Sequence, residues 1–259
     1  MAELDNRVAV VTGAGRGIGR AIAVALAAEG AKVAVAARST DELDALVDEI
    51  SQAGGSAAAV PTDLADPAAP ERLLAAATKR FGLVDILVNN AGLGSSADPR
   101  PVIDFDDIFW DLSLQINLTA PYLLSKGVLA GMVEKGWGRI INIASINSRT
   151  GSVHGAAYAA SKHGLLGLTR TLALEVAADG ITVNAICPGP VKTAMNDIRV
   201  AYDAERLGRP LDEHEAGLTP IGGRLEPEDI APMAVYLASD AARMITGQAY
   251  NICGGMLMS

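Results

Sequence analysis

Short apolar runs alternate along the chain with longer stretches in which apolar residues recur at a helical period. The short runs are rich in Val, Ala and Ile and predict β-strands at Val8–Val11, Lys32–Ala36, Ala57–Pro61, Val84–Asn89, Arg139–Ala144, Thr182–Ile186 and Ala249–Ile252. The longer stretches predict helices at Ile18–Glu29, Asp41–Ala53, Pro67–Phe81, Asp104–Lys135 and Ala156–Ala178. Nearly continuous apolar strands that alternate with helices are typical of a parallel sheet covered on both faces. The pattern therefore predicts a doubly wound α/β fold of about seven parallel strands, with the ligand at their carboxyl ends.

Two segments depart from this alternation. Asp104–Lys135 is too long for a single short crossover helix. Thr193–Leu218 is polar and of mixed charge, with apolar residues at helical intervals, and is predicted to be a mobile lid over the ligand. Because no linker or change in composition divides the chain, residues 1–259 are expected to form one domain, with 193–218 as an insertion.

Composition limits the classes of partner. Apolar residues make up 50% of the chain and aromatic residues 4%, so the core is expected to be aliphatic. The net charge of −9 argues against binding to nucleic acid or to an anionic membrane surface. No apolar run approaches the about 20 residues that span a bilayer, and the first seven residues do not resemble a signal peptide. Cys187 and Cys253 lie in apolar runs, which is typical of reduced, packed thiols in a cytoplasmic protein. The expected ligand is a small molecule.

The first predicted strand leads directly into a glycine-rich loop, Thr12-Gly13-Ala14-Gly15-Arg16-Gly17-Ile18-Gly19, and a helix begins where the loop ends. Glycines allow a tight turn and close approach of the backbone to a ligand. The helix N-terminus offers unpaired N–H groups and positive potential to a pyrophosphate. Such a loop between a first strand and a first helix predicts a dinucleotide site. The spacing is Gly-x3-Gly-x-Gly and not the commoner Gly-x-Gly-x-x-Gly.

With this spacing, the chain resembles the short-chain dehydrogenase/reductase family over its whole length. Further matching motifs are Asp63-Leu64, Asn89-Asn90-Ala91-Gly92, Asn117, Ser145, Tyr158-x3-Lys162 and Pro188-Gly189 followed by Thr193. The resemblance implies a Rossmann fold and a nicotinamide cofactor. It assigns contacts with that cofactor to Gly13, Arg16, Gly17, Ile18, Gly19, Arg38, Asp63, Leu64, Asn90, Ala91, Gly92, Tyr158, Lys162, Pro188, Gly189, Val191 and Thr193.

The same motifs carry the chemistry of alcohol oxidation and ketone reduction. Tyr158 and Lys162 are four residues apart on a predicted helix, so their side chains share one face. A nearby ammonium favours the phenolate, which lowers the tyrosine pKa toward the working pH of a general acid or base. Ser145 ends the fifth predicted strand, where its hydroxyl can bind the substrate oxygen or simply cap a turn. For Asn117 the family resemblance implies a kink of the helix and a water that relays protons to Lys162; the alternative is a buried amide with satisfied hydrogen bonds.

Charge at the end of the second predicted strand indicates the cofactor. NAD-preferring enzymes carry an acid there, which binds the ribose and repels a 2′-phosphate. Here that position is Ala37, followed by Arg38, and Arg16 lies in the glycine loop. Two guanidinium groups with no opposing carboxylate suit a 2′-phosphate, so NADP(H) is expected in preference to NAD(H). The three histidines have no metal-ligand spacing, and no catalytic metal is expected.

The substrate is left open. A small hydroxylated or carbonyl compound of sugar or polyol type is favoured, and the alternative is a 3-oxoacyl carrier-protein reductase. The resemblance implies basic residues near the entrance of such a reductase, where this chain has Gly136 and Asp179, and the predicted lid is acidic. A non-catalytic sensor of NADP(H) is a third hypothesis, although such a protein would not need Tyr158 and Lys162. His154 lies four residues before Tyr158 and either touches the substrate or is an ordinary loop residue.

The apolar surface of the chain predicts a homotetramer. The tail Ile252–Ser259 is nearly all apolar or small, and an apolar chain end left in water would be an association hazard. The predicted helices Asp104–Lys135 and Ala156–Ala178 are apolar over an arc wider than one core-facing stripe needs. Two different self-complementary patches of this kind generate a tetramer with three perpendicular two-fold axes, which the family resemblance also implies.

Overall fold

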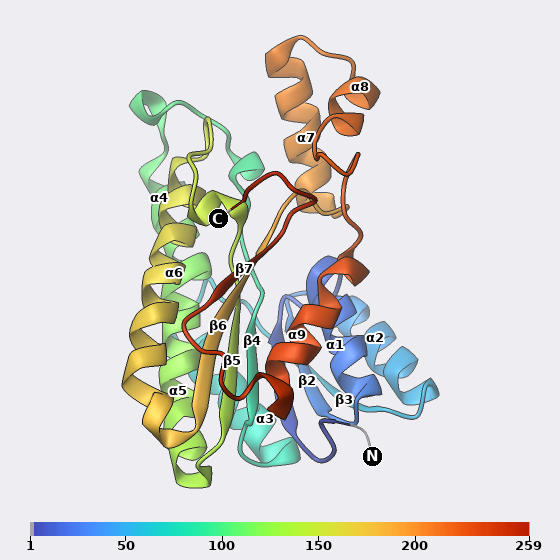
Figure 1. Ribbon diagram of the computed structural model, residues 1–259, viewed down its shortest axis with the longest axis vertical. Coiled ribbons are helices and arrows are strands. Elements are labelled where there is room, and N and C mark those ends of the chain that lie inside the picture. The colour runs from blue at the N-terminus through green and yellow to red at the C-terminus, as the bar shows by residue number, and fades with distance from the viewer. Residues whose placement is uncertain (1–2, 259) are drawn as a thin grey trace.

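The computed structural model describes residues 3–258, so the first two residues and Ser259 of the predicted apolar tail lie outside it. Its centre is a seven-stranded parallel sheet in the order β3-β2-β1-β4-β5-β6-β7 (Figure 1). The strands are β1 (Val8–Thr12), β2 (Lys32–Ala37), β3 (Ser56–Pro61), β4 (Ile86–Asn89), β5 (Gly138–Ile143), β6 (Ile181–Pro188) and β7 (Ala249–Ile252). The predicted fold and number of strands are therefore confirmed.

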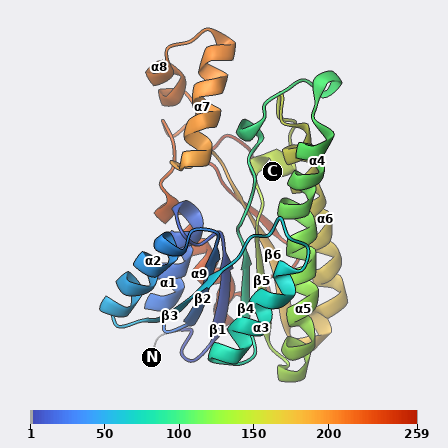
Figure 2. The same ribbon diagram turned by 180° about the vertical axis from the view of Figure 1, so that it is seen from behind.

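Helices cover both faces of the sheet (Figures 1 and 2). One face carries α1 (Gly17–Ala28), α2 (Thr40–Gln52) and α9 (Ala231–Ala238); the other carries α3 (Ala69–Phe81), α5 (Ala120–Lys135) and α6 (Ala156–Val176). Alternate residues of each strand point to opposite faces, so Val11 joins the first core while Val10 joins the second. Helix α9 has no counterpart among the predicted helices, because its eight residues are too uniformly apolar to show a period.

The long segment between β4 and β5 is two helices in line, and not one. Helix α4 (Asp107–Leu114) is followed by a π-helical turn at Gln115–Thr119 and then by α5. Pro121, in the first turn of α5, has no N–H to continue the hydrogen-bond ladder. The kink that the family resemblance implies at Asn117 would fall within this π-helical turn.

The segment after β6 rises above the carboxyl ends of the strands as α7 (Ala194–Leu207) and α8 (Leu211–Ala216), at the top of Figure 1. Thr193 begins α7, because its Oγ1 accepts a hydrogen bond from the backbone N of Asn196 (3.3 Å). Gly208 ends α7 in the left-handed region at φ 63°. None of the helices within residues 3–258 is long and apolar enough to cross a membrane.

Candidate active site

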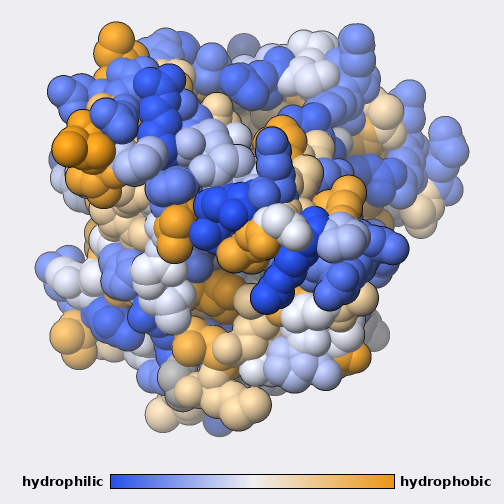
Figure 3. All heavy atoms as spheres, turned by 90° about the horizontal axis from the view of Figure 1, so that it is seen from above, coloured by the Kyte–Doolittle hydropathy of each residue, from blue (hydrophilic) through white to orange (hydrophobic). Residues whose placement is uncertain are grey.

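A cavity of about 890 Å³ opens between the carboxyl ends of the strands and helix α7. Seen from above, this end of the molecule is hollowed, and polar and apolar side chains both border the hollow (Figure 3). The split in the strand order, where β1 lies beside β4, is the place at which a doubly wound sheet leaves room for a ligand. Every residue assigned above to catalysis or cofactor binding, apart from Gly19 and Asn117, lines this cavity.

The glycine loop after β1 is shaped by contacts that leave no room for side chains. Gly13 has φ 64°, and a Cβ there would lie 2.8 Å from Ala91 Cα. Gly17 has φ 56°, and its Cβ would lie 2.9 Å from Thr193 Cγ2. Gly19 does not line the cavity because it faces inward, where a Cβ would collide with the Gly13 carbonyl. The loop is thus a bare backbone cradle at the N-terminus of α1, which fits the pyrophosphate of a dinucleotide.

Asn90 holds this cradle in place. Its Nδ2 donates to the carbonyl oxygens of Thr12 (2.9 Å) and Gly13 (3.1 Å). In return, Thr12 Oγ1 accepts hydrogen bonds from the backbone N of Asn90 and of Ala91, both at 3.0 Å. The loop after β4 is therefore tied to the loop after β1. The sequence predicted Asn90 only as a cofactor contact and did not predict this structural role.

Tyr158 and Lys162 project from one face of α6 toward the end of β5. The Lys162 Nζ is 5.8 Å from the centre of the Tyr158 ring and donates to the Ile143 carbonyl (2.8 Å). Ser145 forms a side-chain hydrogen bond with Tyr158 and also accepts one from the backbone N of Asn147 (3.1 Å). Ser145 thus caps a turn and presents its hydroxyl to the cavity at the same time.

Burial controls the ionisation of this pair. It raises the pKa of Tyr158, and the Ser145 hydrogen bond offsets part of that rise. Lys162 is 4% exposed, and burial lowers its pKa from 10.5 to about 8. Burial of Tyr158 opposes the lowering of its pKa that was expected from the ammonium, and Lys162 Nζ donates to the Ile143 carbonyl.

Asn117 is fully buried in the π-helical turn. Its Nδ2 donates to the Leu93 carbonyl (3.0 Å) and to Ser161 Oγ (3.1 Å), while its Oδ1 accepts from the Leu93 backbone N (2.8 Å). Gly92 lies beside both this amide and Lys162, since a Cβ on Gly92 would lie 3.3 Å from Asn117 Oδ1 and 3.8 Å from Lys162 Nζ. The amide is satisfied by protein groups, and the water relay stays a prediction.

At the other end of the cavity, Arg38 is exposed at the end of β2 and forms no ion pair within the described part of the chain. Arg16 does have an opposing carboxylate, because Nη1 lies 3.9 Å from Oε1 of Glu42 in the first turn of α2. The expectation that no carboxylate opposes the two arginines is therefore wrong. Asp63, beside the buried Leu64, accepts a hydrogen bond from the Ala65 backbone N (3.0 Å).

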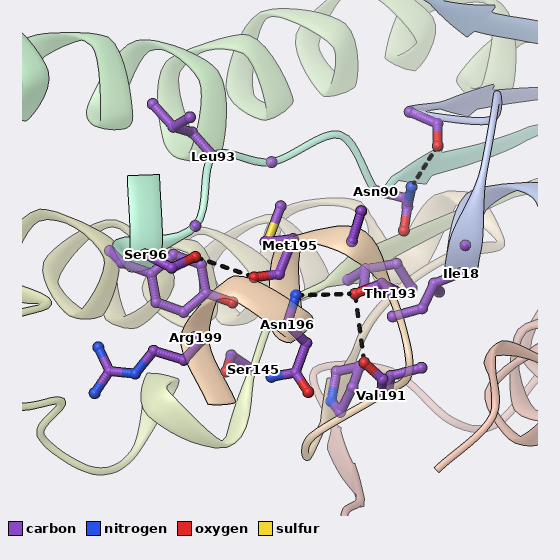
Figure 4. A pocket seen from close by; sticks show the side chains of 18 of the residues that line it. Ile18, Asn90, Leu93, Ser96, Ser145, Val191, Thr193, Met195, Asn196 and Arg199 are labelled. Atoms are coloured by element: carbon purple, nitrogen blue, oxygen red, sulfur yellow. Dashed lines mark hydrogen bonds between the residues drawn. The ribbon is translucent and has the colours of Figure 1, made fainter. Parts of the chain in front are cut away.

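The turn after β6 completes the cofactor side of the cavity. Gly189 packs so closely on the C-terminal segment that a Cβ would lie 2.8 Å from Cys253 Cα. Val191 is buried and pairs with Leu225, and its carbonyl accepts a hydrogen bond from Thr193 Oγ1 (3.4 Å; Figure 4). Pro188, Gly189, Val191 and Thr193 thus form one continuous wall.

The remaining wall consists of residues that the sequence did not single out. They come from the loops after β4 and β5 and from α7, and they include Ser95, Ser96, Asn147, Met195, Asn196 and Arg199. Figure 4 labels Ser96, Met195, Asn196 and Arg199. The spacing of Met195, Arg199 and Asp203, one helical turn apart, could have indicated a shared face. Arg199 pairs with Asp203, with its Nε 2.6 Å from Oδ2.

His154 contacts helix α7. Its Nδ1 lies 2.5 Å from the Tyr202 hydroxyl on α7, and its backbone is in the left-handed region at φ 57°. The side chain is not among those that line the cavity. The histidine thus joins the loop before α6 to α7. In residues 3–258, His, Cys, Asp and Glu form no cluster suited to a metal ion.

A family model described as short chain dehydrogenase matches residues 7–202. The chain belongs to the short-chain dehydrogenase family. This short-chain dehydrogenase is 41% identical over 254 residues to the 3-oxoacyl-[acyl-carrier-protein] reductase of Escherichia coli, with 98% of each chain covered.

Solved structures agree with this assignment. A variant of actinorhodin polyketide ketoreductase with NADPH superposes with a TM-score of 0.92 at 40% identity, covering 99% of each chain. A candidate NAD(P)-dependent gluconate 5-dehydrogenase from Beutenbergia cavernae, with bound NADP, gives 0.89 at 44% identity and the same coverage. The protein is an oxidoreductase that interconverts secondary alcohols and ketones with a nicotinamide cofactor.

The lowered pKa of Lys162 predicts an alkaline limit to ketone reduction. Its charge is present below pH 8 and is lost as the pH rises through about 8, whereas Tyr158, with its raised pKa, stays protonated there. We expect kcat/KM for reduction to fall above this pH. In the Lys162→Arg variant the fall should move to higher pH, at a lower rate, because arginine stays charged. The measurement is kcat/KM between about pH 6 and pH 10, and an alkaline limit shared by both enzymes would contradict the assignment.

Proposed function

We propose that this protein is an NADP(H)-dependent oxidoreductase for a small, polar secondary alcohol or ketone of sugar or polyol type. The observation that carries the proposal is the wall opposite the cofactor cradle. Hydroxyl and amide side chains of Ser95, Ser96, Ser145, Asn147 and Asn196 line it. A cavity lined in this way suits a hydroxylated substrate better than an aliphatic chain. The two cysteines are free and buried, which fits a reducing compartment such as the cytoplasm.

Each polar group at the cavity floor has a part in the proposed reaction. Ser145 binds the substrate oxygen, and Tyr158 gives that oxygen a proton in reduction or takes one in oxidation. Lys162 holds the nicotinamide ribose and keeps positive charge near the phenol. Asn117 maintains the π-helical turn behind them and is the residue through which a relay water is expected. The nicotinamide cofactor, when bound, supplies or accepts the hydride.

The preference for NADP(H) rests on Arg38. Its guanidinium is exposed on the cavity wall at the end of β2, with no acid at the neighbouring Ala37. Arg16 contributes less than Arg38, because Glu42 opposes its charge. Similar proteins hold NADPH or NADP in their solved structures, which supports the same choice for this chain.

A second candidate function is reduction of a 3-oxoacyl group on a carrier protein. It is supported by the 41% identity to the E. coli reductase of that name. Two exposed residues, Gly136 and Asp179, argue against this function, because recognition of an acidic carrier protein would favour cationic side chains at these positions. The hypothesis of a non-catalytic sensor is weaker, because the serine, tyrosine and lysine share one cavity.

The proposed activity is tested by following NADPH oxidation over a panel of ketoses, keto acids, simple ketones and a 3-oxoacyl thioester. Turnover of the small polar ketones above the thioester would support the proposal, and the reverse order would favour the second candidate. Tyr158→Phe should lower kcat by about 10²–10⁴-fold while leaving the Kd for NADPH nearly unchanged, because it removes only the proton donor. A variant that keeps more than about a tenth of the activity would refute the role of Tyr158.

Arg38→Asp should shift the preference of the enzyme from NADPH to NADH. The change removes a charged hydrogen-bond donor and adds repulsion, which should cost NADPH roughly 2–4 kcal/mol, or about 30- to 1000-fold in kcat/KM. The ratio of kcat/KM for the two cofactors measures this shift. Arg16→Asp is the matched control, since Arg16 is already paired with Glu42 and should contribute less. An unchanged ratio in Arg38→Asp would refute the assignment.

We also propose that the protein is a homotetramer. Leu174 on α6 and Ile108 on α4 have exposed fractions of 86% and 79%, and Met258 in the tail has 84%. Large apolar side chains this exposed are expected to be covered by another copy. Light scattering should give about four times the 26.6 kDa chain mass, and Leu174→Glu should give a smaller species. A monomer at micromolar concentration would contradict the proposal.

A further inference from the structure

The side-chain oxygen of Asn196 is buried and has no hydrogen-bond partner within residues 3–258. Asn196 lies in the first turn of α7 and lines the cavity. In Figure 4 its amide extends from α7 in the direction of Ser145 and Val191, which line the same cavity. A buried acceptor without a partner carries a free-energy cost, and a ligand that donates a hydrogen bond to it removes that cost.

The start of α7, which carries this amide, is held in place from several sides. The backbone N of Asn196 donates to Thr193 Oγ1 (3.3 Å), and Ser96 Oγ donates to the Met195 carbonyl (3.0 Å). One turn further along α7, Arg199 donates to a backbone carbonyl of the loop before α6 (3.1 Å). These contacts tie the first turns of α7 to both neighbouring loops. Since the backbone that carries the acceptor is already ordered, only the Asn196 side chain has to be ordered when a donor binds.

The group that fits this acceptor is a substrate hydroxyl. The cavity wall around it carries hydroxyl and amide groups from Ser95, Ser96, Ser145, Asn147 and Ser152, and one turn along α7 it already carries the Arg199 guanidinium, which is paired with Asp203. A neutral hydrogen-bond donor therefore suits the Asn196 acceptor better than an ammonium group does. Because Ser145 and Tyr158 hold the reacting oxygen in the proposed function, on which this inference rests, the acceptor is available to a hydroxyl on the adjacent carbon.

We propose that Asn196 determines specificity by accepting a hydrogen bond from a hydroxyl on the carbon next to the reacting carbonyl. The substrates of this enzyme are then α-hydroxyketones, and its products vicinal diols. The hydroxyl only donates a hydrogen bond, so the hydride and proton transfers of the reaction are unchanged.

The test compares 3-hydroxy-2-butanone with 2-butanone, which differ only in that hydroxyl. For the unaltered enzyme kcat/KM should be higher for 3-hydroxy-2-butanone. In Asn196→Leu the ratio of the two values should fall about tenfold, because the acceptor is lost. Asn196→Asp keeps an acceptor at the same place and should keep most of the ratio. Glu205→Leu, on an exposed position of α7 outside the cavity, is the control for a leucine added to the lid helix.

An unchanged ratio in Asn196→Leu would overturn the inference. Weaker binding of NADPH by Asn196→Leu, with an unchanged ratio, would also overturn the inference, because the acceptor would then bind the carboxamide of the cofactor. If the unaltered enzyme reduces neither ketone, the proposed function fails. The inference about Asn196 is then tested separately, by calorimetric titration of 2,3-butanediol into the NADP⁺ complex. Diol binding that is lost in Asn196→Leu but kept in Asn196→Asp supports it; equal binding, or none, to all three proteins overturns it.

Discussion

The close contact between the loops that follow β1 and β4 is the constraint on which the rest of the site depends. These strands are neighbours in the sheet, yet their loops turn to opposite faces, which opens the cavity. The Asn90 amide bridges the opening by binding two carbonyls of the first loop, and Gly13 lets the two backbones approach. Without this tie, the glycine loop would not be fixed against the loop after β4.

A small number of hydrogen bonds also positions Tyr158 and Lys162. The π-helical turn places Asn117 between the loop after β4 and Ser161 of α6, so the helix carrying Tyr158 is positioned by the same loop that ties down the glycine cradle. Lys162 is fixed to the end of β5 through the Ile143 carbonyl. The glycine loop and Tyr158 are therefore connected through the loop after β4 and a short path of hydrogen bonds, and Lys162 lies one helical turn beyond Tyr158. Burial lowers the pKa of this lysine to about 8.

Residues that act through local geometry could be predicted from the sequence, and those that act through packing of distant helices could not. The glycine spacing and the Tyr158-x3-Lys162 pair each require only one turn or one helix face, and both lie where they were expected. Glu42 was missed because its approach to Arg16 depends on how α2 packs beside α1. Asn196 was missed because nothing in a polar lid segment distinguishes a side chain that faces the cavity. Helix α9 was missed because a uniformly apolar segment has no period.

The contact between β7 and the turn after β6 has a consequence for local unfolding. The backbone N of Gly189 donates to the Ile252 carbonyl (2.9 Å), and Gly189 packs on Cys253, so this wall of the cavity is supported by β7. Because β7 is an edge strand that, within residues 3–258, pairs only with β6, it can detach while the other strand pairs of the sheet stay intact. Local opening of this edge would therefore loosen the wall of the cavity before the rest of the sheet unfolds.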